Sequence, residues 1–154
     1  HRGYYDHMEE SHELLAFYGN EKIWDILAEN PRNRVVVFGE QPEMLRFPCS
    51  TQSYTDIEGS GGNFNLSSSP EALADFFTFA GVDYIYLGSG YLKPGTDGFR
   101  NVTGLLKQGY LMDLLYENGN GLAVFSSDPK NLTEEESEAL LAEFTEKYWP
   151  GEQQ

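Results

Sequence analysis

Residues 81–90 read GVDYIYLGSG, a short and mainly apolar run enclosed by glycines. Val82 to Leu87 has the length of a strand, and its apolar character is typical of a strand covered on both faces, as in a parallel sheet. A second run of this kind, Val35 to Phe38, ends at Gly39. We therefore predict that these two segments are central, parallel strands of one sheet.

Helix signals surround these strands. Ser69-Pro70 supplies the N-cap and the first position of a helix, and Gly81 supplies its C-terminal stop. Asn20 is the expected N-cap of an earlier helix. Thr133 and Glu136 form a capping box at the start of the last one. The helices expected from these signals and from apolar residues spaced three and four apart cover residues 5–18, 20–30, 69–81, 99–109 and 133–149.

A β-hairpin is expected between the last two helices. Tyr110 to Tyr116 and Leu122 to Phe125 are strand-like, and Asn118-Gly119 between them suits a type I′ turn, in which both central residues need a positive φ. Strands and helices alternate along most of the chain, which favours parallel neighbours joined by right-handed crossovers. We predict an α/β fold, a three-layer sandwich whose mostly parallel sheet carries an antiparallel hairpin at its edge. Residues 1–154 are expected to form a single domain, with residues 1–19 as a connecting helix.

The stretch from residue 40 to residue 69 has little regular pattern. It contains Pro42, Pro48 and the glycine-rich cluster 59–62, and only Ser53 to Ile57 is weakly strand-like. Long irregular segments within a compact domain are usually functional or mobile. We expect residues 58–65 to be mobile or held by a partner.

The chain is strongly acidic. It has 10 Lys and Arg against 25 Asp and Glu, for a formal net charge of −15, and the acids are spread over both halves. This argues against a nucleic acid or an anionic membrane surface as a partner, because such partners are bound by clustered basic residues. Apolar residues make up 40% of the chain, too many for a disordered protein. The lone Cys49 offers neither a disulfide nor a redox pair.

Two motifs resemble ligand loops and then depart from them. Gly88-Ser89-Gly90 follows a strand and precedes a helix, where a phosphate loop would lie, but Thr96-Asp97 stands in place of the Lys-Ser/Thr of a P-loop. Asp56 to Gly61 matches the first half of a calcium loop, but Ser67 occupies the twelfth position, where a bidentate Glu is needed. We therefore expect no cofactor and no metal.

Several segments together resemble a known family. They are 80–87 (AGVDYIYL), 109–111 (GYL), 114–118 (LLYEN) and 122–125 (LAVF). Over about residues 20–126 the chain is similar to the soluble extracytoplasmic domain at the C-terminal end of polytopic GT-C type membrane glycosyltransferases, which use lipid-phosphate sugars. The last expected helix, 133–149, departs from that pattern.

The resemblance implies an accessory function. In that family the catalytic carboxylate belongs to an extracytoplasmic loop of the membrane part, so no catalytic residue is carried over to this chain. The implied location is the extracytoplasmic side of a cell membrane. The implied partners are the membrane-embedded part of the parent chain and a glycan or polyprenyl-linked sugar acceptor. The candidate binding residues are Tyr54, Asp56, Glu58, Gly88, Ser89 and Tyr91.

A second hypothesis comes from the fold class alone. A free-standing flavodoxin-like or hydrolase-like α/β enzyme would bind a small molecule at the carboxyl ends of the strands that finish at Phe38 and Leu87. Tyr84, Tyr86, Tyr91 and Tyr110, in and near the strands, suit stacking on sugar rings, although packing in the core and at strand edges explains them better. The sequence leaves both hypotheses open.

Overall fold

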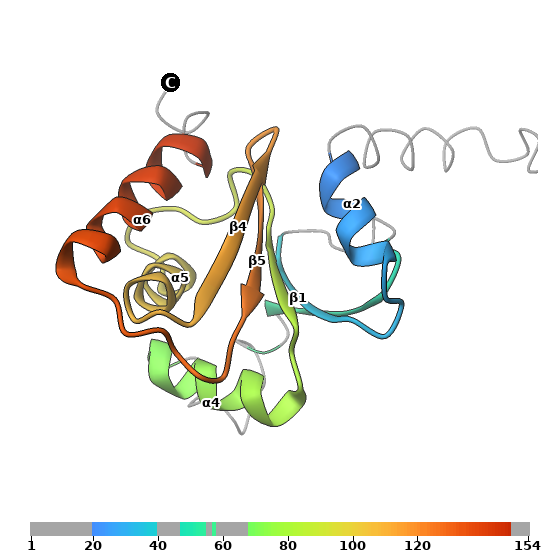
Figure 1. The fold of residues 1–154 in the computed structure, drawn as a ribbon, viewed down its shortest axis with the longest axis horizontal. Helices are drawn as coiled ribbons and strands as arrows, with labels where there is room; N and C mark the ends of the chain where they lie inside the picture. The colour runs from blue at the N-terminus through green and yellow to red at the C-terminus, as the bar shows by residue number, and fades with distance from the viewer. Residues whose placement is uncertain (1–19, 40–46, 55–56, 58–67, 149–154) are drawn as a thin grey trace, which may run out of the picture.

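The computed structural model describes residues 20–39, 47–54, 57 and 68–148. In this part of the chain a five-stranded mixed sheet is combined with four helices, which confirms the α/β class (Figure 1). The helices are α2 (Glu21–Ala28), α4 (Pro70–Ala80), α5 (Asp97–Lys107) and α6 (Glu134–Tyr148). The strands are β1 (Arg34–Phe38), β2 (Ser50–Ser53), β3 (Tyr84–Leu87), β4 (Leu111–Glu117) and β5 (Asn120–Phe125).

The strand order of the sheet is β2-β1-β3-β5-β4. Strand β1 is parallel to both β2 and β3, so the prediction of two central parallel strands is confirmed. Strands β4 and β5 form the predicted antiparallel hairpin, with φ values of 54° at Asn118 and 82° at Gly119. The second strand of the hairpin, β5, lies next to β3 and runs antiparallel to it, so the sheet has two parallel and two antiparallel pairings.

Both faces of the central strands are covered. Val36 and Phe38 of β1 belong to a core cluster with side chains of α4, α5 and α6. Val35 and Val37 point to the other face, where they pack with residues of α2. Figure 1 shows α2 on one side of the sheet and α5 and α6 on the other. This burial on both faces explains why the strand sequences lack polar alternation.

The local signals at the ends of α4 and α6 are confirmed. The hydroxyl of Ser69 accepts a hydrogen bond from the amide of Ala72 (3.1 Å), and Gly81 ends α4 in the left-handed conformation with φ of 71°. Thr133 and Glu136 form the expected reciprocal capping box, with distances of 2.9 and 3.1 Å.

The start of α2 differs from the prediction. Asn20 occupies the N-cap position, but its side chain makes no capping hydrogen bond. The carboxylate of Glu117, at the end of β4, instead accepts hydrogen bonds from the amides of Lys22 (3.0 Å) and Ile23 (3.2 Å). A carboxylate at a helix N-terminus satisfies unpaired amides and opposes the positive end of the helix dipole. The helix is therefore capped by a residue distant in sequence, which no local pattern indicates.

One strand was also missed. The sequence Ser-Thr-Gln-Ser of β2 lies within the stretch that we expected to be irregular, and the weak strand signal from Ser53 to Ile57 was placed too late. Strand β2 is a polar edge strand with mostly exposed side chains, and its pairing with β1 defines it. The expected helix at 5–18 and the expected loop at 58–65 lie outside the described residues.

The capping of α2 predicts a stability effect. Replacing Glu117 with Ala leaves the first amides of α2 without this acceptor, and we expect a loss of about 1–2 kcal/mol in the free energy of unfolding. Glu117→Gln keeps an acceptor oxygen and is expected to cost less. Urea unfolding measures both effects. The exposed Glu138 on α6 provides the control, since Glu138→Ala should change stability by no more than about 0.5 kcal/mol. Equal losses for Glu117→Ala and Glu138→Ala would contradict the capping assignment.

Candidate functional site

The loop from Gly88 to Leu92 leaves the carboxyl end of β3, and four of its five backbone amides are bonded within the protein. Four donors are engaged: Gly88 to the Phe38 carbonyl (2.8 Å), Ser89 to Oδ1 of Asn120 (2.8 Å), Tyr91 to the Gly88 carbonyl (3.1 Å) and Leu92 to the Tyr148 hydroxyl (3.0 Å). A phosphate-binding loop needs such amides to point at the ligand. The glycine loop is thus built as a structural turn, in agreement with the absence of the P-loop lysine.

The tip of the hairpin packs against this loop. A Cβ atom placed on Gly119 would lie 2.7 Å from the hydroxyl oxygen of Ser89, so the glycine at this position allows a close approach as well as the positive φ of the turn. The neighbouring Asn120 accepts the hydrogen bond from the Ser89 amide. Ser89 is therefore held by the hairpin.

Tyr148, at the end of α6, fixes the loop from the other side. Its hydroxyl donates to the Gly88 carbonyl and accepts from the Leu92 amide, so one phenol ties both ends of the loop. The side chain is 1% exposed, and its ring stacks on Phe144 with a centroid distance of 5.0 Å. Helix α6, which lies outside the family resemblance, thus positions the segment that carries Tyr91.

A cavity of about 310 Å³ opens beside this loop. Tyr54, Tyr91, Leu92, Thr96 and Gly98 line it. The cavity lies between the carboxyl end of β3 and the first turn of α5.

Tyr54 forms a fixed wall of the cavity. It is 1% exposed, its ring stacks on Phe38 at 4.3 Å, and its hydroxyl accepts a hydrogen bond from Nδ2 of Asn101 (3.1 Å). A Cβ on Gly98 would come within 3.2 Å of Leu92 and 3.4 Å of Tyr54, so the glycine keeps this part of the cavity open. The cavity is formed by the loop after β3, the first turn of α5 and the segment after β2.

The position of the cavity agrees with a general rule for α/β sheets. The connection that follows β1 places Phe47 and Cys49 on the α2 side of the sheet, whereas the connection after β3 leads to α5 on the opposite side. Ligands of α/β proteins bind where the connections of adjacent parallel strands leave to opposite faces. The cavity adjoins this point through Tyr54, which stacks on Phe38 at the end of β1.

The candidate residues from the sequence are distributed as follows. Tyr54 and Tyr91, far apart in the chain, line one cavity. Gly88 and Ser89 lie in the adjoining loop, where internal hydrogen bonds hold them. The structure does not describe residues 56 and 58, so Asp56 and Glu58 stay predictions. The sequence reading missed three further lining residues and the loop-fixing tyrosine, which are Leu92, Thr96, Gly98 and Tyr148.

The cavity offers aromatic and hydroxyl groups. Among the described residues, four side chains and Gly98 line it; none of the four is acidic or basic, and their polar atoms are the hydroxyls of two tyrosines and Thr96. Asp97 lies in the first turn of α5, so a carboxylate already stands at the positive end of this helix dipole. Asp97 also pairs with Arg100 at 2.9 Å. Such a cavity suits a neutral, hydroxylated or aromatic ligand better than a phosphate.

Two features elsewhere argue against other chemistries. Burial and the nearby Asp83 carboxylate raise the pKa of the Cys49 thiol, which disfavours the nucleophilic thiolate. Within the described ranges, no group of three His, Cys, Asp or Glu side chains is arranged to hold a metal ion.

A scan against protein-family models finds no match to this chain, and searches of curated proteins and of solved structures also find none. Among the helices that the structure describes, none has both the length and the apolar character needed to cross a membrane.

The role of Tyr148 predicts a specific defect. Tyr148→Phe removes the hydroxyl that bridges Gly88 and Leu92, while the stacked ring is kept. We expect a loss of about 2 kcal/mol in the free energy of unfolding, because the buried Leu92 amide loses its acceptor and the half-buried Gly88 carbonyl keeps only the hydrogen bond from the Tyr91 amide. Hydrogen exchange at the Leu92 amide should accelerate in the same variant.

Tyr110→Phe is the matched control for this experiment. The ring of Tyr110 also stacks on a phenylalanine, Phe125, with a centroid distance of 6.1 Å. Removing the hydroxyl of Tyr110 should lower the free energy of unfolding by no more than about 0.5 kcal/mol. If Tyr148→Phe behaved like this control in both stability and exchange, the positioning role of Tyr148 would be rejected.

Proposed function

We propose that this chain is an extracytoplasmic accessory domain of a GT-C type membrane glycosyltransferase-like protein, and that it binds a glycan or sugar acceptor without catalysing transfer. Two lines of reasoning support the proposal. One is the resemblance of residues 20–126 to such domains. The other, which carries it, is the cavity that brings Tyr54 and Tyr91 together.

The chemistry of a sugar ring fits this cavity. Tyrosine combines a flat apolar ring with a polar hydroxyl, so it can pack on the C–H face of a sugar and hydrogen-bond to its hydroxyls. A volume of about 310 Å³ is at the lower end of the roughly 300–1,000 Å³ typical of ligand pockets, which favours one or two sugar residues. The described lining has no charged side chain, which suits a neutral sugar rather than a sugar phosphate.

The partner in this proposal is the membrane-embedded part of the parent chain, which would supply the catalytic carboxylate. A net charge of −15 is compatible with the extracytoplasmic side, where the positive-inside rule does not require basic segments. We also take α2 on one face of the sheet and α4, α5 and α6 on the other as the outer layers of a three-layer sandwich.

The enzyme hypothesis is kept as the second candidate. Its support is the location of the cavity at the carboxyl ends of the central parallel strands, where α/β enzymes bind small molecules. The lining residues that the structure describes do not supply a recognisable acid, base and nucleophile set, which favours the binding domain.

Sugar binding is the direct test. We expect methyl glycosides of glucose, mannose or N-acetylglucosamine to shift the amide NMR signals of Tyr91, Leu92 and Gly98, with a dissociation constant of about 1 mM or above for the best of them. Tyr91→Ala should weaken this binding by about ten-fold, which corresponds to the loss of one aromatic contact. Tyr91→Phe should retain most of it.

Two controls make the outcome decisive. Sorbitol has the hydroxyls of a sugar without the ring and should not produce the shifts, and Tyr110→Ala removes a tyrosine that is not among the cavity's lining residues. Equal shifts from sorbitol, or sugar shifts that avoid the cavity, would overturn the sugar-binding proposal. Micromolar binding of FMN or ATP at the cavity would favour the enzyme hypothesis instead.

A further inference from the structure

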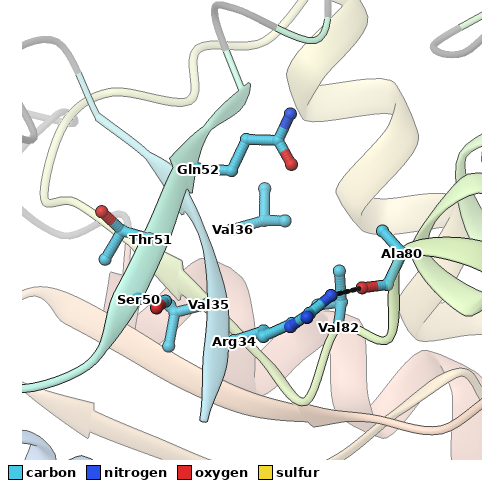
Figure 2. Close-up of a pocket in the computed structure, with 8 residues that line it drawn as sticks. All are labelled: Arg34, Val35, Val36, Ser50, Thr51, Gln52, Ala80 and Val82. Atoms are coloured by element: carbon cyan, nitrogen blue, oxygen red, sulfur yellow. Dashed lines mark hydrogen bonds between the residues drawn. The ribbon is translucent and has the colours of Figure 1, made fainter. Parts of the chain in front are cut away.

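A second cavity, of about 260 Å³, lies at the opposite end of β1 (Figure 2). Strands β1 and β2 form one side of it, and the C-terminal end of α4 together with Val82 forms the other. Arg34 is the first residue of β1, whereas the tyrosine-lined cavity adjoins the last, Phe38. The two cavities therefore lie at opposite ends of the sheet.

A guanidinium group borders this cavity. One nitrogen of the Arg34 head donates to the Ala80 carbonyl at 2.7 Å, which holds the head over the last turn of α4. Among the described residues, no carboxylate lies within ion-pair distance of this guanidinium. The chain has 25 acidic and 10 basic residues, yet within the described part of the structure this arginine has a backbone carbonyl and no carboxylate as its partner. A guanidinium has five N–H donors, and the bond to Ala80 uses one of them.

The rest of the lining comprises the amide of Gln52, the residues Ser50 and Thr51, and an apolar floor. Figure 2 shows the Gln52 side chain and Val36 projecting from the sheet into the same space, across from Ala80 and Val82. Val36 and Val82 are 1% and 8% exposed, so the floor belongs to the hydrophobic core. The cavity therefore pairs a cationic edge with an apolar base.

We propose that this cavity binds a small carboxylate with a short apolar body. The planar fork of an arginine matches a carboxylate in two parallel hydrogen bonds, and the amide of Gln52 supplies a further donor. The valine and alanine side chains suit a chain of a few carbon atoms. A volume of about 260 Å³ lies below the range typical of drug-sized ligands, which limits the ligand to a small molecule. Asp83, whose carboxylate accepts from the Arg34 amide at 2.9 Å, reduces the positive potential, so the affinity is modest.

The test uses butyrate as the probe, with butyramide as its uncharged analogue and inorganic phosphate as an anion without an apolar body. We expect butyrate to shift the amide NMR signals of Val36, Gln52 and Val82 with a dissociation constant of about 1–10 mM. Butyramide and phosphate should each bind at least about ten-fold more weakly, because butyramide lacks the negative charge and phosphate lacks the apolar chain.

Variants assign the binding to named groups. Arg34→Gln should weaken butyrate binding about ten-fold or more, and Gln52→Ala should weaken it several-fold while leaving the Arg34 bond to α4 in place. Arg32→Gln removes the same charge from a nearby exposed residue, and its effect should stay within about two-fold. If Arg34→Gln does not fold, Gln52→Ala decides the question.

Four results would overturn the proposal. They are the absence of butyrate shifts at the cavity, equal binding of butyramide, equal binding of phosphate, and unchanged butyrate affinity in a folded Arg34→Gln or Gln52→Ala variant. Equal weakening by Arg32→Gln would reduce the effect to general charge and would also reject the site.

Discussion

Strands β1 and β3 lie side by side at the centre of the sheet, and protein covers both of their faces. The side chains of Val35 to Phe38 and of Ile85 to Leu87 are at most 2% exposed. The parallel pairing brings the carboxyl ends of the two strands to the same edge, so the loop that follows β3 begins beside the end of β1, where the Gly88 amide donates to the Phe38 carbonyl. The backbone groups of this loop lie close to the core, and the protein supplies hydrogen-bond partners for them.

The hydrogen-bond partners come from residues that are far apart in the sequence. Oδ1 of Asn20 accepts from the Tyr86 hydroxyl (3.2 Å) and from Nδ2 of Asn120 (3.0 Å), and Asn120 in turn accepts from the Ser89 amide. Burial raises the pKa of Tyr86 well above its ordinary value, which keeps its phenol neutral and able to donate. This network joins α2, β3 and the hairpin, and Tyr148 of α6 completes it. These hydrogen bonds hold the glycine loop against the hairpin and α6, beside the tyrosine-lined cavity.

The sequence predicted those features that local chemistry determines. The apolar runs of β1 and β3, the Asn118-Gly119 turn, the Ser69 cap and the capping box are all confirmed, because each depends on neighbouring residues. Strand β2 was missed because its side chains are polar and its pairing with β1 alone defines it. The capping of α2 by Glu117 was missed for the same physical reason: tertiary contact decides it. In the candidate site, aromatic character indicated Tyr54 and Tyr91, but only the fold brings them to one cavity with Thr96 and Gly98.

Native-state hydrogen exchange at the glycine loop tests the central claim most directly, which is that this loop is a structural turn whose amides are used inside the protein. The amides of Ser89 and Leu92 are bonded to side chains from β5 and α6. We predict that they exchange slowly, with opening free energies close to those of the β3 amides. Exchange at the rate of an exposed loop would contradict the account, because the amides would then be available to a phosphate ligand.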